Sequence, residues 1–316
     1  MIREQMGHTP VATDRLVEWM APALGRPGAV YFDATIGMGG HAAVIAERFP
    51  SCRIVGLDRD PAAIEWSSQR LGSRASLRRA GFAEIAAVAA SLGLDQLDGI
   101  LFDLGVSSVQ LDSDERGFAY SRDTPLDMRM DPELPVTAAD ILATYSQVQL
   151  MRILRDYGEE RFAGRIASRI VTERADRPLT HSGQLVELVR QAVPAPARRK
   201  GGNPAKRTFQ ALRIEVNGEL DQIALALPAA IRLLRPGGRL VVMSYHSLED
   251  AAVKRALRLE ATSKAPPGLP VEPESAKPVL RILTRGAEPA SASEIQSNPR
   301  SASLRLRAAE KIREMT

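Results

Sequence analysis

Apolar and polar positions alternate between two patterns along the first hundred residues. Short apolar runs that predict buried strands cover residues 29–35, 52–58 and 97–104, and SLRRAGF at 76–82 predicts a weaker third strand in the order of the chain. Amphipathic stretches with helical spacing lie between them, such as HAAVIAERF at 41–49 and PAAIEWSSQRL after the second strand. Strands that alternate with helices in this way indicate an α/β fold, with a parallel sheet covered by helices.

This alternation stops after residue 112, and a long helical segment is predicted to follow. Thr137, Ser146 and Thr180 are each expected to open a helix, because a hydroxyl N-cap precedes apolar residues at helical spacing. The pattern therefore predicts a helical domain inserted into a sheet domain. The predicted sheet domain comprises residues 1–111 and 216–316, and the inserted helical domain comprises residues 112–215.

The sheet pattern resumes after the insertion. A helix that includes Leu234 is predicted to end at RPGG, residues 235–238, because Pro and Gly stop helices. RLVVMSYHS at 239–247 predicts a buried strand, and the segments 279–284 and 303–310 predict a closing hairpin. The Pro-, Ser- and Lys-rich stretch at 262–278 is typical of a mobile loop.

The first predicted strand runs into a glycine-rich turn, YFDATIGMGGH at 31–41. GMGGHA at 37–42 satisfies the dinucleotide-binding pattern GxGxxA, and Asp58 follows its first glycine by 21 residues, at the end of the second strand. That spacing suits a carboxylate that binds ribose hydroxyls. Asp60 precedes Pro61 and is better explained as a helix N-cap. The glycines alone are weak support, because they also permit tight turns without a ligand.

Asp33, just upstream of the turn, discriminates between cofactors. A carboxylate beside a pyrophosphate costs roughly 4 kcal/mol for one charge pair at ~4 Å and an effective dielectric of ~20. S-adenosylmethionine carries a cationic sulfonium and an ammonium group, and it has no phosphate. Unless Asp33 only caps the backbone, the acid favours S-adenosylmethionine over NAD.

Motifs along nearly the whole chain carry a family resemblance. They include HTPV at 8–11, DATIGMGGH at 33–41, DGILFDLGVSSVQLD at 98–112, RTFQALRIEVNGEL at 207–220 and NPRSASLRLR near the C-terminus. On these motifs the sequence resembles the bacterial RsmH (MraW) family, the 16S ribosomal RNA cytosine-N4 methyltransferases. The resemblance implies a Rossmann-like class I S-adenosylmethionine-dependent methyltransferase with an inserted all-helical domain for substrate recognition.

The resemblance also implies which residues bind the cofactor. Matching the motifs position by position gives Gly39, Gly40, His41, Asp58, Phe82, Asp103 and Gln110. The charge considerations add Asp33 to this set. The glycines would let the backbone approach the amino-acid end, and Phe82 would stack on adenine. His41 opens a helix, and without the resemblance it would be interpreted as structural.

Asp103 is the main catalytic candidate. The cytosine amine is a poor nucleophile, so transfer needs N4 held in line with the methyl–sulfur bond and an acceptor for its hydrogen; positioning alone can supply about 7–11 kcal/mol. Many amino methyltransferases place an acid and an aromatic after strand four, and here Asp103-Leu104-Gly105-Val106 keeps only the acid. Asp103 could accept from N4, bind the cofactor and leave acceptance to the Leu104 carbonyl, or merely cap the turn. The sulfonium is already activated, so no metal is expected.

Four further residues are candidates for substrate contact, and two of them, His246 and Asn217, join Asp103 as catalytic candidates. His246, in SYHSLED, follows the predicted fifth strand and is expected at the carboxyl edge of the sheet, where it or Tyr245 could contact the flipped base. Asn217 and Glu219, in EVNGEL, could read the cytosine edge. A structural role is the alternative for each: a strand-end histidine for His246 and a capped helix junction for Asn217.

Composition bears on location and partners. The chain has 316 residues and a net charge of +4, and Cys52 is its only cysteine, which rules out an internal disulfide and a cysteine zinc cluster. No 18-residue apolar run and no signal-peptide pattern is found, so a cytoplasmic protein without a membrane partner is expected. Five of the ten residues from Arg198 to Arg207 are basic. These basic residues suit a loop that follows a phosphate backbone, and the resemblance implies that the partner is 16S rRNA in the small ribosomal subunit, bound by a monomer or homodimer.

Two other functions compete with this interpretation. An NAD-dependent dehydrogenase would use the GxGxxA turn and Asp58, but Asp33 opposes it. A catalytically inactive rRNA-binding assembly factor would not need the intact glycine turn and DLGVSS segment. Departures from the family pattern put individual RNA contacts in doubt, and they fall at Asn203-Pro204-Ala205-Lys206, Ala251 and Ala302.

Overall fold

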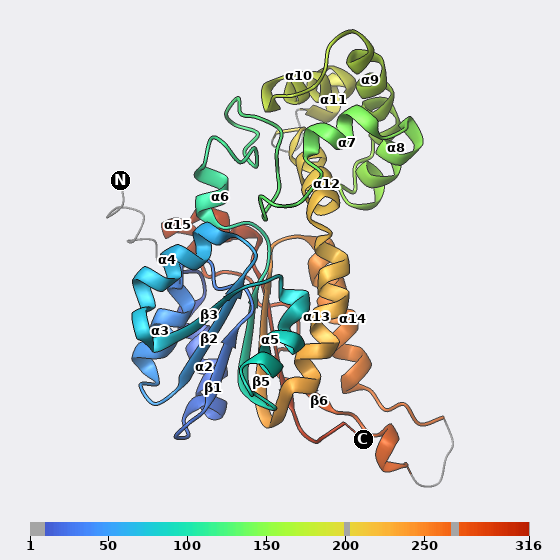
Figure 1. The fold of residues 1–316 in the computed structure, drawn as a ribbon. Coiled ribbons are helices and arrows are strands. Elements are labelled where there is room, and N and C mark those ends of the chain that lie inside the picture. The colour runs from blue at the N-terminus through green and yellow to red at the C-terminus, as the bar shows by residue number, and fades with distance from the viewer. Residues whose placement is uncertain (1–9, 199–202, 267–271, 316) are drawn as a thin grey trace. The chain divides into compact units, whose positions relative to one another are not determined.

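Two compact units form the protein in this computed structural model, which describes residues 10–198, 203–266 and 272–315 (Figure 1). The first unit comprises residues 1–105 and 220–316, and the second comprises residues 106–219. The domain boundaries predicted from the sequence differ from this division by a few residues, and the recognition role of the inserted domain stays a prediction. Within the described residues, no helix combines the length and apolarity that crossing a membrane requires.

The first unit is built on a seven-stranded sheet with the order β3-β2-β1-β4-β5-β7-β6. Strands β1 to β5 run parallel to one another, and β7 is antiparallel to both β5 and β6. The predicted α/β class and closing antiparallel pair are therefore confirmed. The strands are β1 Val30–Asp33, β2 Arg53–Asp58, β3 Ala75–Arg79, β4 Leu97–Asp103, β5 Leu234–Ser244, β6 Leu280–Ile282 and β7 Arg305–Lys311.

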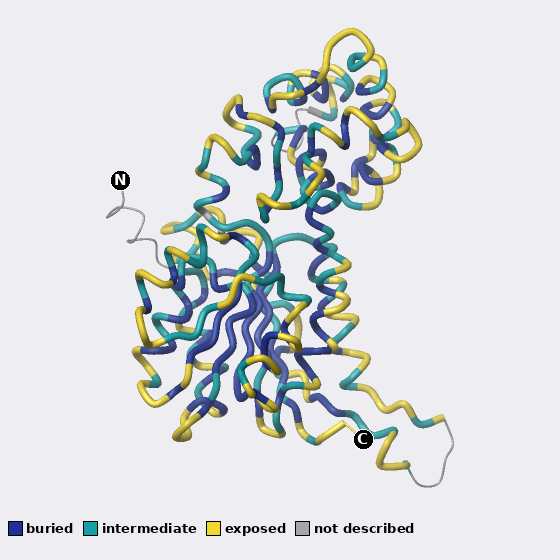
Figure 2. The backbone as a smooth tube through the Cα atoms, viewed as in Figure 1, coloured by how far each residue is buried: buried dark blue, intermediate teal, exposed yellow. Residues whose placement is uncertain are grey.

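Helices cover both faces of this sheet because successive strand side chains alternate between two apolar clusters. Tyr31 and Leu101 pack with α2 (Thr13–Leu24), α3 (Gly40–Arg48) and α4 (Pro61–Leu71). Phe32 and Phe102 pack on the opposite face with α5, α13 and α14. The central strands β1, β2, β4 and β5 are accordingly mostly buried (Figure 2). The remaining elements of the unit are α5 Ile85–Ser91, α13 Glu219–Leu233, α14 Ser247–Ala261, α15 Ala292–Ser297 and the 3-10 turns Gly72–Arg74, Phe82–Glu84, Glu274–Ala276 and Pro299–Ser303.

The second unit is helical and has its own apolar core. Thr137 and Ser146 are N-caps, as predicted, and each hydroxyl accepts a backbone hydrogen bond from the residue three positions later. The third predicted start was one residue early, because His181 rather than Thr180 is the N-cap. The helices are α6 Ser108–Asp112, α7 Ala138–Thr144, α8 Gln147–Asp156, α9 Ala163–Asp176, α10 Ser182–Ala192, α11 Ala195–Arg198 and α12 Lys206–Asn217.

The predicted boundaries of the fifth strand were wrong. Helix α13 ends at Leu233, and β5 begins at Leu234 and includes the RPGG segment. Leu234 pairs with Leu97, and a register irregularity before the next pair accommodates Gly237, whose φ of 83° suits glycine. The strand ends at Ser244 because Glu249 binds the next two backbone N–H groups and helix α14 follows. The third strand likewise ends at Arg79, before Phe82. Of the predicted loop at 262–278, residues 267–271 lie outside the described residues.

Asp98 lies near the amino end of β4, at the edge of the sheet opposite the carboxyl ends of its parallel strands, and connects several segments there. It is 1% exposed, and its carboxylate accepts two bonds from Arg26 (2.7 and 2.9 Å), one from Arg235 (3.1 Å) and one from the Val30 N–H (2.8 Å). Asp98→Ala should lower the free energy of unfolding by about 2–4 kcal/mol. The loss would be larger if the guanidinium groups of Arg26 and Arg235 were also fully buried, but both are partly exposed. Urea denaturation measures this. The exposed Asp95→Ala should change it by less than about 0.5 kcal/mol, and equal losses would contradict the assignment.

Candidate active site

Three carboxyl groups stand at the carboxyl ends of parallel strands in the first unit. Asp33 ends β1, Asp58 ends β2 and Asp103 ends β4. Strands β1 and β4 are neighbours, but the chain proceeds from them in opposite directions, to β2 and β3 on one side and to β5 on the other. Ligands of open α/β sheets bind at such a switch point, outside the carboxyl ends of the strands. The three acids therefore surround the expected ligand position.

The glycine turn connects β1 to α3 within this edge. Gly37 and Gly39 have φ of 50° and 72°, in the left-handed region that favours glycine. A Cβ on Gly40 would lie 2.6 Å from Cγ of Pro10, so only glycine fits there without displacing the N-terminal segment. The Asp58 carboxylate accepts from the Gly37 N–H (3.1 Å) and the Asp60 N–H (2.9 Å). Burial raises the pKa of Asp58 to about 6, although these two bonds oppose the shift.

Asp33 lies beneath the turn and is 1% exposed. It accepts hydrogen bonds from the Tyr31 hydroxyl (3.3 Å) and the Thr35 N–H (3.2 Å). Burial raises the pKa of Asp33 to about 7, while His41 and the Thr35 bond lower it. The Thr35 bond matches the backbone-cap alternative, and direct contact of Asp33 with a cofactor stays a prediction. When ionised, its carboxylate interacts electrostatically with the turn, because the buried surroundings screen the charge poorly.

His41 occupies the first turn of α3 and links the acids to the N-terminal segment. Its Nε2 lies 2.8 Å from the Val11 carbonyl and donates to it, and its Nδ1 lies 3.6 Å from Oδ2 of Asp103, with which it forms an ion pair when the ring is protonated. The first two residues of the HTPV motif, 8 and 9, lie outside the described residues. The local role of His41 is thus to join the motif to the strand-end acids.

Asp103 keeps a partly exposed carboxylate, with 28% of its side chain accessible. Its Oδ1 accepts from the Tyr245 hydroxyl at 2.8 Å, and its backbone N–H donates to Oγ1 of Thr35 at 2.7 Å. Burial raises the pKa of Asp103, whereas His41 and the Tyr245 bond lower it. Burial and Asp103 raise the pKa of Tyr245 well above its ordinary value, so the hydroxyl stays protonated and donates at neutral pH. Tyr245 therefore orients the acid.

The bond from Tyr245 to Asp103 and the support from Thr35 were not predicted from the sequence. Tyr245 follows β5 and Thr35 follows β1, the two strands that flank β4 in the sheet. The only signal for Tyr245 was its position at a predicted strand end, where it was considered as a contact for the base. Adjacency in the sheet, which the sequence does not state, brings the three residues together.

Phe82 and Gln110 occupy different units. Phe82 begins a 3-10 turn after β3, its ring meets Phe102 edge-on at 5.9 Å, and the Arg59 guanidinium lies 5.9 Å from the ring centroid. Stacking of Phe82 on adenine stays a prediction. Gln110, in α6 of the second unit, is 6% exposed and forms a capping box with Ser107, with bonds of 3.1 and 3.2 Å. Its contact with the cofactor also stays a prediction.

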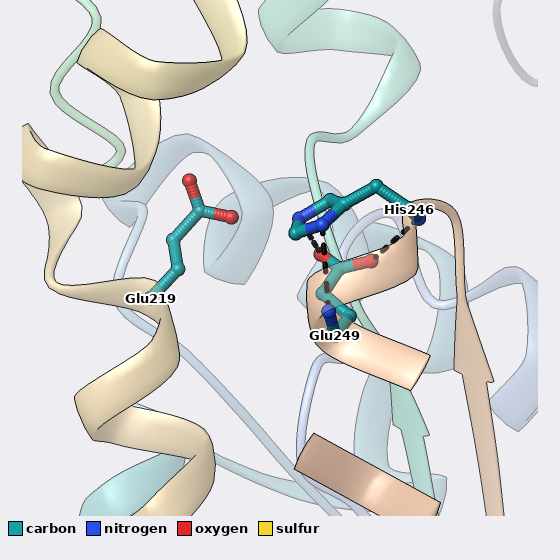
Figure 3. A group of neighbouring side chains, drawn as sticks. All are labelled: Glu219, His246 and Glu249. Carbon is teal, nitrogen blue, oxygen red and sulfur yellow. Dashed lines mark hydrogen bonds and ion pairs between the residues drawn. The ribbon is translucent and has the colours of Figure 1, made fainter. Parts of the chain in front are cut away.

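The contacts of His246 and Asn217 correspond to their structural alternatives. His246 caps α14: its Nδ1 accepts from the Glu249 N–H at 3.4 Å, and its Nε2 lies 3.0 Å from Oε1 of the buried Glu249 (Figure 3). Asn217 is 3% exposed, accepts from the Met130 N–H (2.7 Å) and donates to carbonyls of the second unit. Glu219, also drawn, accepts two bonds from Arg213, of 2.7 and 2.8 Å. A catalytic role for His246 or Asn217 stays a prediction.

The charge of the site fits a cationic ligand without phosphate. Three acids surround the glycine turn, and His41 is the ring that lowers the pKa of two of them, Asp33 and Asp103. A pyrophosphate would meet net repulsion here, whereas a sulfonium and an ammonium group would relieve the repulsion among the acids. The fold and this acidic glycine turn are those of a Rossmann-like class I methyltransferase that uses S-adenosylmethionine.

Comparison with known proteins identifies the family within this class. The chain belongs to the MraW methylase family, whose model matches residues 5–312. It is 62% identical to "Ribosomal RNA small subunit methyltransferase H" of Frankia alni over 96% of this chain and 95% of that protein, and 55% identical to the protein of the same name from Mycolicibacterium smegmatis over 97% and 84%. A crystal structure of an rRNA methylase from Streptococcus thermophilus aligns with a TM-score of 0.42 at 13% identity, covering 96% of this chain and 95% of that one.

Proposed function

We propose that the protein transfers the methyl group of S-adenosylmethionine to the exocyclic N4 of a decoding-centre cytidine, near the P-site codon of 16S rRNA, in the cytoplasm. Membership of the MraW methylase family and relatives named for the ribosomal small subunit support this substrate class. The observation that carries the proposal is Asp103: a partly exposed acceptor at the sheet switch point, oriented by Tyr245 beside the glycine turn.

Residues of the first unit would hold the cofactor. Gly39 and Gly40 would let the backbone approach its amino-acid end, Asp58 would accept from its ribose hydroxyls, and Phe82 would contact its adenine. When bound, S-adenosylmethionine supplies an activated methyl group on a cationic sulfur. The Asp58 carboxylate already accepts two backbone N–H bonds, which hold it in one orientation and lower the cost of ordering it when a ligand binds.

Asp103 would accept a hydrogen bond from the cytosine amine as N4 attacks. Tyr245 donates to Oδ1, so Oδ2, which lies 3.6 Å from Nδ1 of His41, is the oxygen proposed to accept from the substrate. This function needs the ionised carboxylate, and the Tyr245 bond opposes the upward effect of burial on the Asp103 pKa. The Leu104 carbonyl is the alternative acceptor; the Leu104 N–H, in the preceding peptide group, donates to the Met243 carbonyl at 2.9 Å and holds the start of this turn against β5.

Tyr245→Phe tests this orientation. Loss of the hydroxyl removes a bond that lowers the Asp103 pKa, so the acidic limb of the pH–rate profile should move to higher pH. Activity at a pH above this limb should fall much less than for removal of Asp103 itself. The measurement is single-turnover methyl transfer from pH 5.5 to 9. An unchanged acidic limb in a normally folded variant would refute the orienting role.

The second unit, including the basic segment from Arg198 to Arg207, is proposed to bind the rRNA that flanks the target cytidine. A cytidine within folded rRNA must be unstacked, at a cost of a few kcal/mol, which contacts with flanking phosphates would offset. Residues 199–202 of the basic segment lie outside the described residues. Reversing the charges of Arg198, Arg199 and Lys200 should weaken association with the small subunit and reduce the salt slope by about 2–3.

A charge-matched control exists in the first unit. Lys254, Arg255 and Arg258 are exposed on α14, and reversing all three changes the net charge by the same amount. Filter binding from 50 to 300 mM salt compares the two triple variants. If both weaken binding equally, or if reversal at 198–200 leaves the slope unchanged, a specific phosphate contact of the basic segment is refuted.

The proposed reaction is tested by product analysis. Small subunits from cells that lack this protein are incubated with the purified protein and labelled S-adenosylmethionine, and the 16S rRNA is digested to nucleosides. We expect label in N4-methylcytidine at one position. Label in a different methylated nucleoside would overturn the N4 assignment. Tight binding to the subunit without label would instead support the inactive assembly factor.

A further inference from the structure

Gln222 presents a buried acceptor that the structure leaves unused. It lies near the start of α13, and its Oε1 atom is inaccessible to solvent and accepts no hydrogen bond within the described part of the chain. A buried oxygen without a donor is destabilising by about 1–3 kcal/mol, so it calls for an explanation. A donor supplied by a ligand is one such explanation.

The position of this oxygen indicates which part of a ligand it faces. A Cβ on Gly81 would lie 3.1 Å from Oε1 of Gln222, so the oxygen sits against the segment that follows β3. That segment is bonded to the end of β2, since the Ala80 N–H donates to the Asp58 carbonyl at 3.0 Å. It continues directly into Phe82. Gln222 is therefore placed one strand further out than the proposed ribose contact, on the side where the base attached to that ribose must lie.

Among the described side chains around Gly81, Gln222 has a buried acceptor that has no donor. The Glu84 carboxylate accepts from the Gly81 N–H at 2.9 Å, which holds it to the turn. Arg59, whose Nη2 would be 3.7 Å from a Cβ on Gly81, can only donate. The adenine of the cofactor carries an exocyclic N6 amino group with two hydrogens. Among these three side chains, Gln222 has the matching carbonyl oxygen in place.

We propose that Oε1 of Gln222 accepts a hydrogen bond from the adenine N6 amino group and makes the site selective for adenine. This inference rests on the cofactor placement under Proposed function. A base with a 6-oxo group would place its own acceptor oxygen against Oε1 of Gln222, and the two would repel each other. A base with hydrogen at C6 would leave Oε1 without a hydrogen-bond donor. Both should bind more weakly than adenine for this reason.

The test is calorimetric binding of S-adenosylhomocysteine and of its analogue with hydrogen in place of the amino group. The wild-type protein should bind the analogue about tenfold more weakly. Gln222→Met keeps the side-chain length and removes the acceptor. Binding of S-adenosylhomocysteine should therefore weaken while binding of the analogue does not, and the ratio of the two dissociation constants should fall close to one. Gln222→Glu keeps an acceptor and should keep the preference. Gln69→Met, an exposed glutamine on α4, is the matched control and should behave as wild type.

Each outcome bears on the proposal. A wild-type ratio near one, or a Gln222→Met variant that keeps the wild-type ratio, overturns it. If Gln222→Met does not fold, the Gln222→Glu variant decides. Loss of its preference for the amino-bearing ligand overturns the proposal. If the variant keeps that preference and also binds the 6-oxo analogue more weakly, the proposal is supported. Folded wild-type protein that binds no S-adenosylhomocysteine would overturn the cofactor placement itself, a result distinct from binding without selectivity.

Discussion

Alanine in place of Asp103 is expected to abolish methyl transfer to the small subunit while the protein stays folded. The substitution removes the acceptor proposed for the cytosine amine, an effect of about 10²–10⁴-fold on the rate for a positioned acid or base. It also removes the partner of the Tyr245 hydroxyl and one of the acids around the cofactor site. Single-turnover transfer with saturating S-adenosylmethionine measures the loss in the chemical step.

Two comparisons make this prediction specific. Asp95→Ala removes an exposed aspartate before the amino end of β4 and should transfer methyl at the wild-type rate. Asp103→Asn keeps an oxygen that can accept from Tyr245, so it should fold and bind cofactor better than the alanine variant and still lose most of the rate. Near-normal methylation by folded Asp103→Ala would refute an essential role and would favour the Leu104 carbonyl as acceptor.

Asp33→Asn is expected to stabilise the cofactor-free protein at pH 8 and to weaken binding of S-adenosylmethionine. Burial raises the pKa of Asp33 from 3.8 to about 7, so the folded protein holds this proton more tightly than the unfolded chain does. The favourable contribution is complete below about pH 4 and is lost as the pH rises through 7. At pH 8 the ionised carboxyl therefore destabilises the fold by about 2–4 kcal/mol, which the amide avoids.

Thermal unfolding at two pH values tests the stability effect. Because only part of the penalty exists at pH 5, the gain in Tm from Asp33→Asn should be clearly larger at pH 8 than at pH 5. Asp95→Asn should show no such difference. Calorimetry should find S-adenosylmethionine binding weakened about tenfold or more at pH 8, with a smaller effect on the uncharged sulfur of S-adenosylhomocysteine. Equal gains at both pH values, or unchanged binding, would contradict the electrostatic role of Asp33.

Local features were predictable from the sequence where one short segment contains both the cause and the effect. The strand-end acids Asp33, Asp58 and Asp103 follow apolar runs, and the caps at Thr137 and Ser146 precede helical spacing. The RPGG segment misled the prediction because Pro and Gly usually end elements, whereas here pairing with Leu97 across a register irregularity keeps them within β5. Pairing between distant segments overrode the local signal.

Two parts of the site were less predictable. One is the set of contacts between segments that are distant in the sequence, and the other is the set of polar residues that could be either functional or structural. Tyr245 reaches Asp103 because β5 and β4 are paired, and Gln222 reaches the segment after β3 because α13 packs on the same sheet face as α5. His246 and Asn217 show the reverse case. Their motifs marked them as functional candidates, but the observed side-chain contacts are with a helix terminus and with the backbone.

The central claim is that the acids around the glycine turn select a cationic methyl donor that has no phosphate. Titration calorimetry with S-adenosylmethionine and with NAD tests this claim most directly. We expect S-adenosylmethionine to bind with an affinity that rises from pH 6 to pH 8, as Asp33 and Asp58 lose their protons, and NAD to give no saturable heat. Saturation by NAD together with no heat from S-adenosylmethionine in the folded protein would contradict this selection.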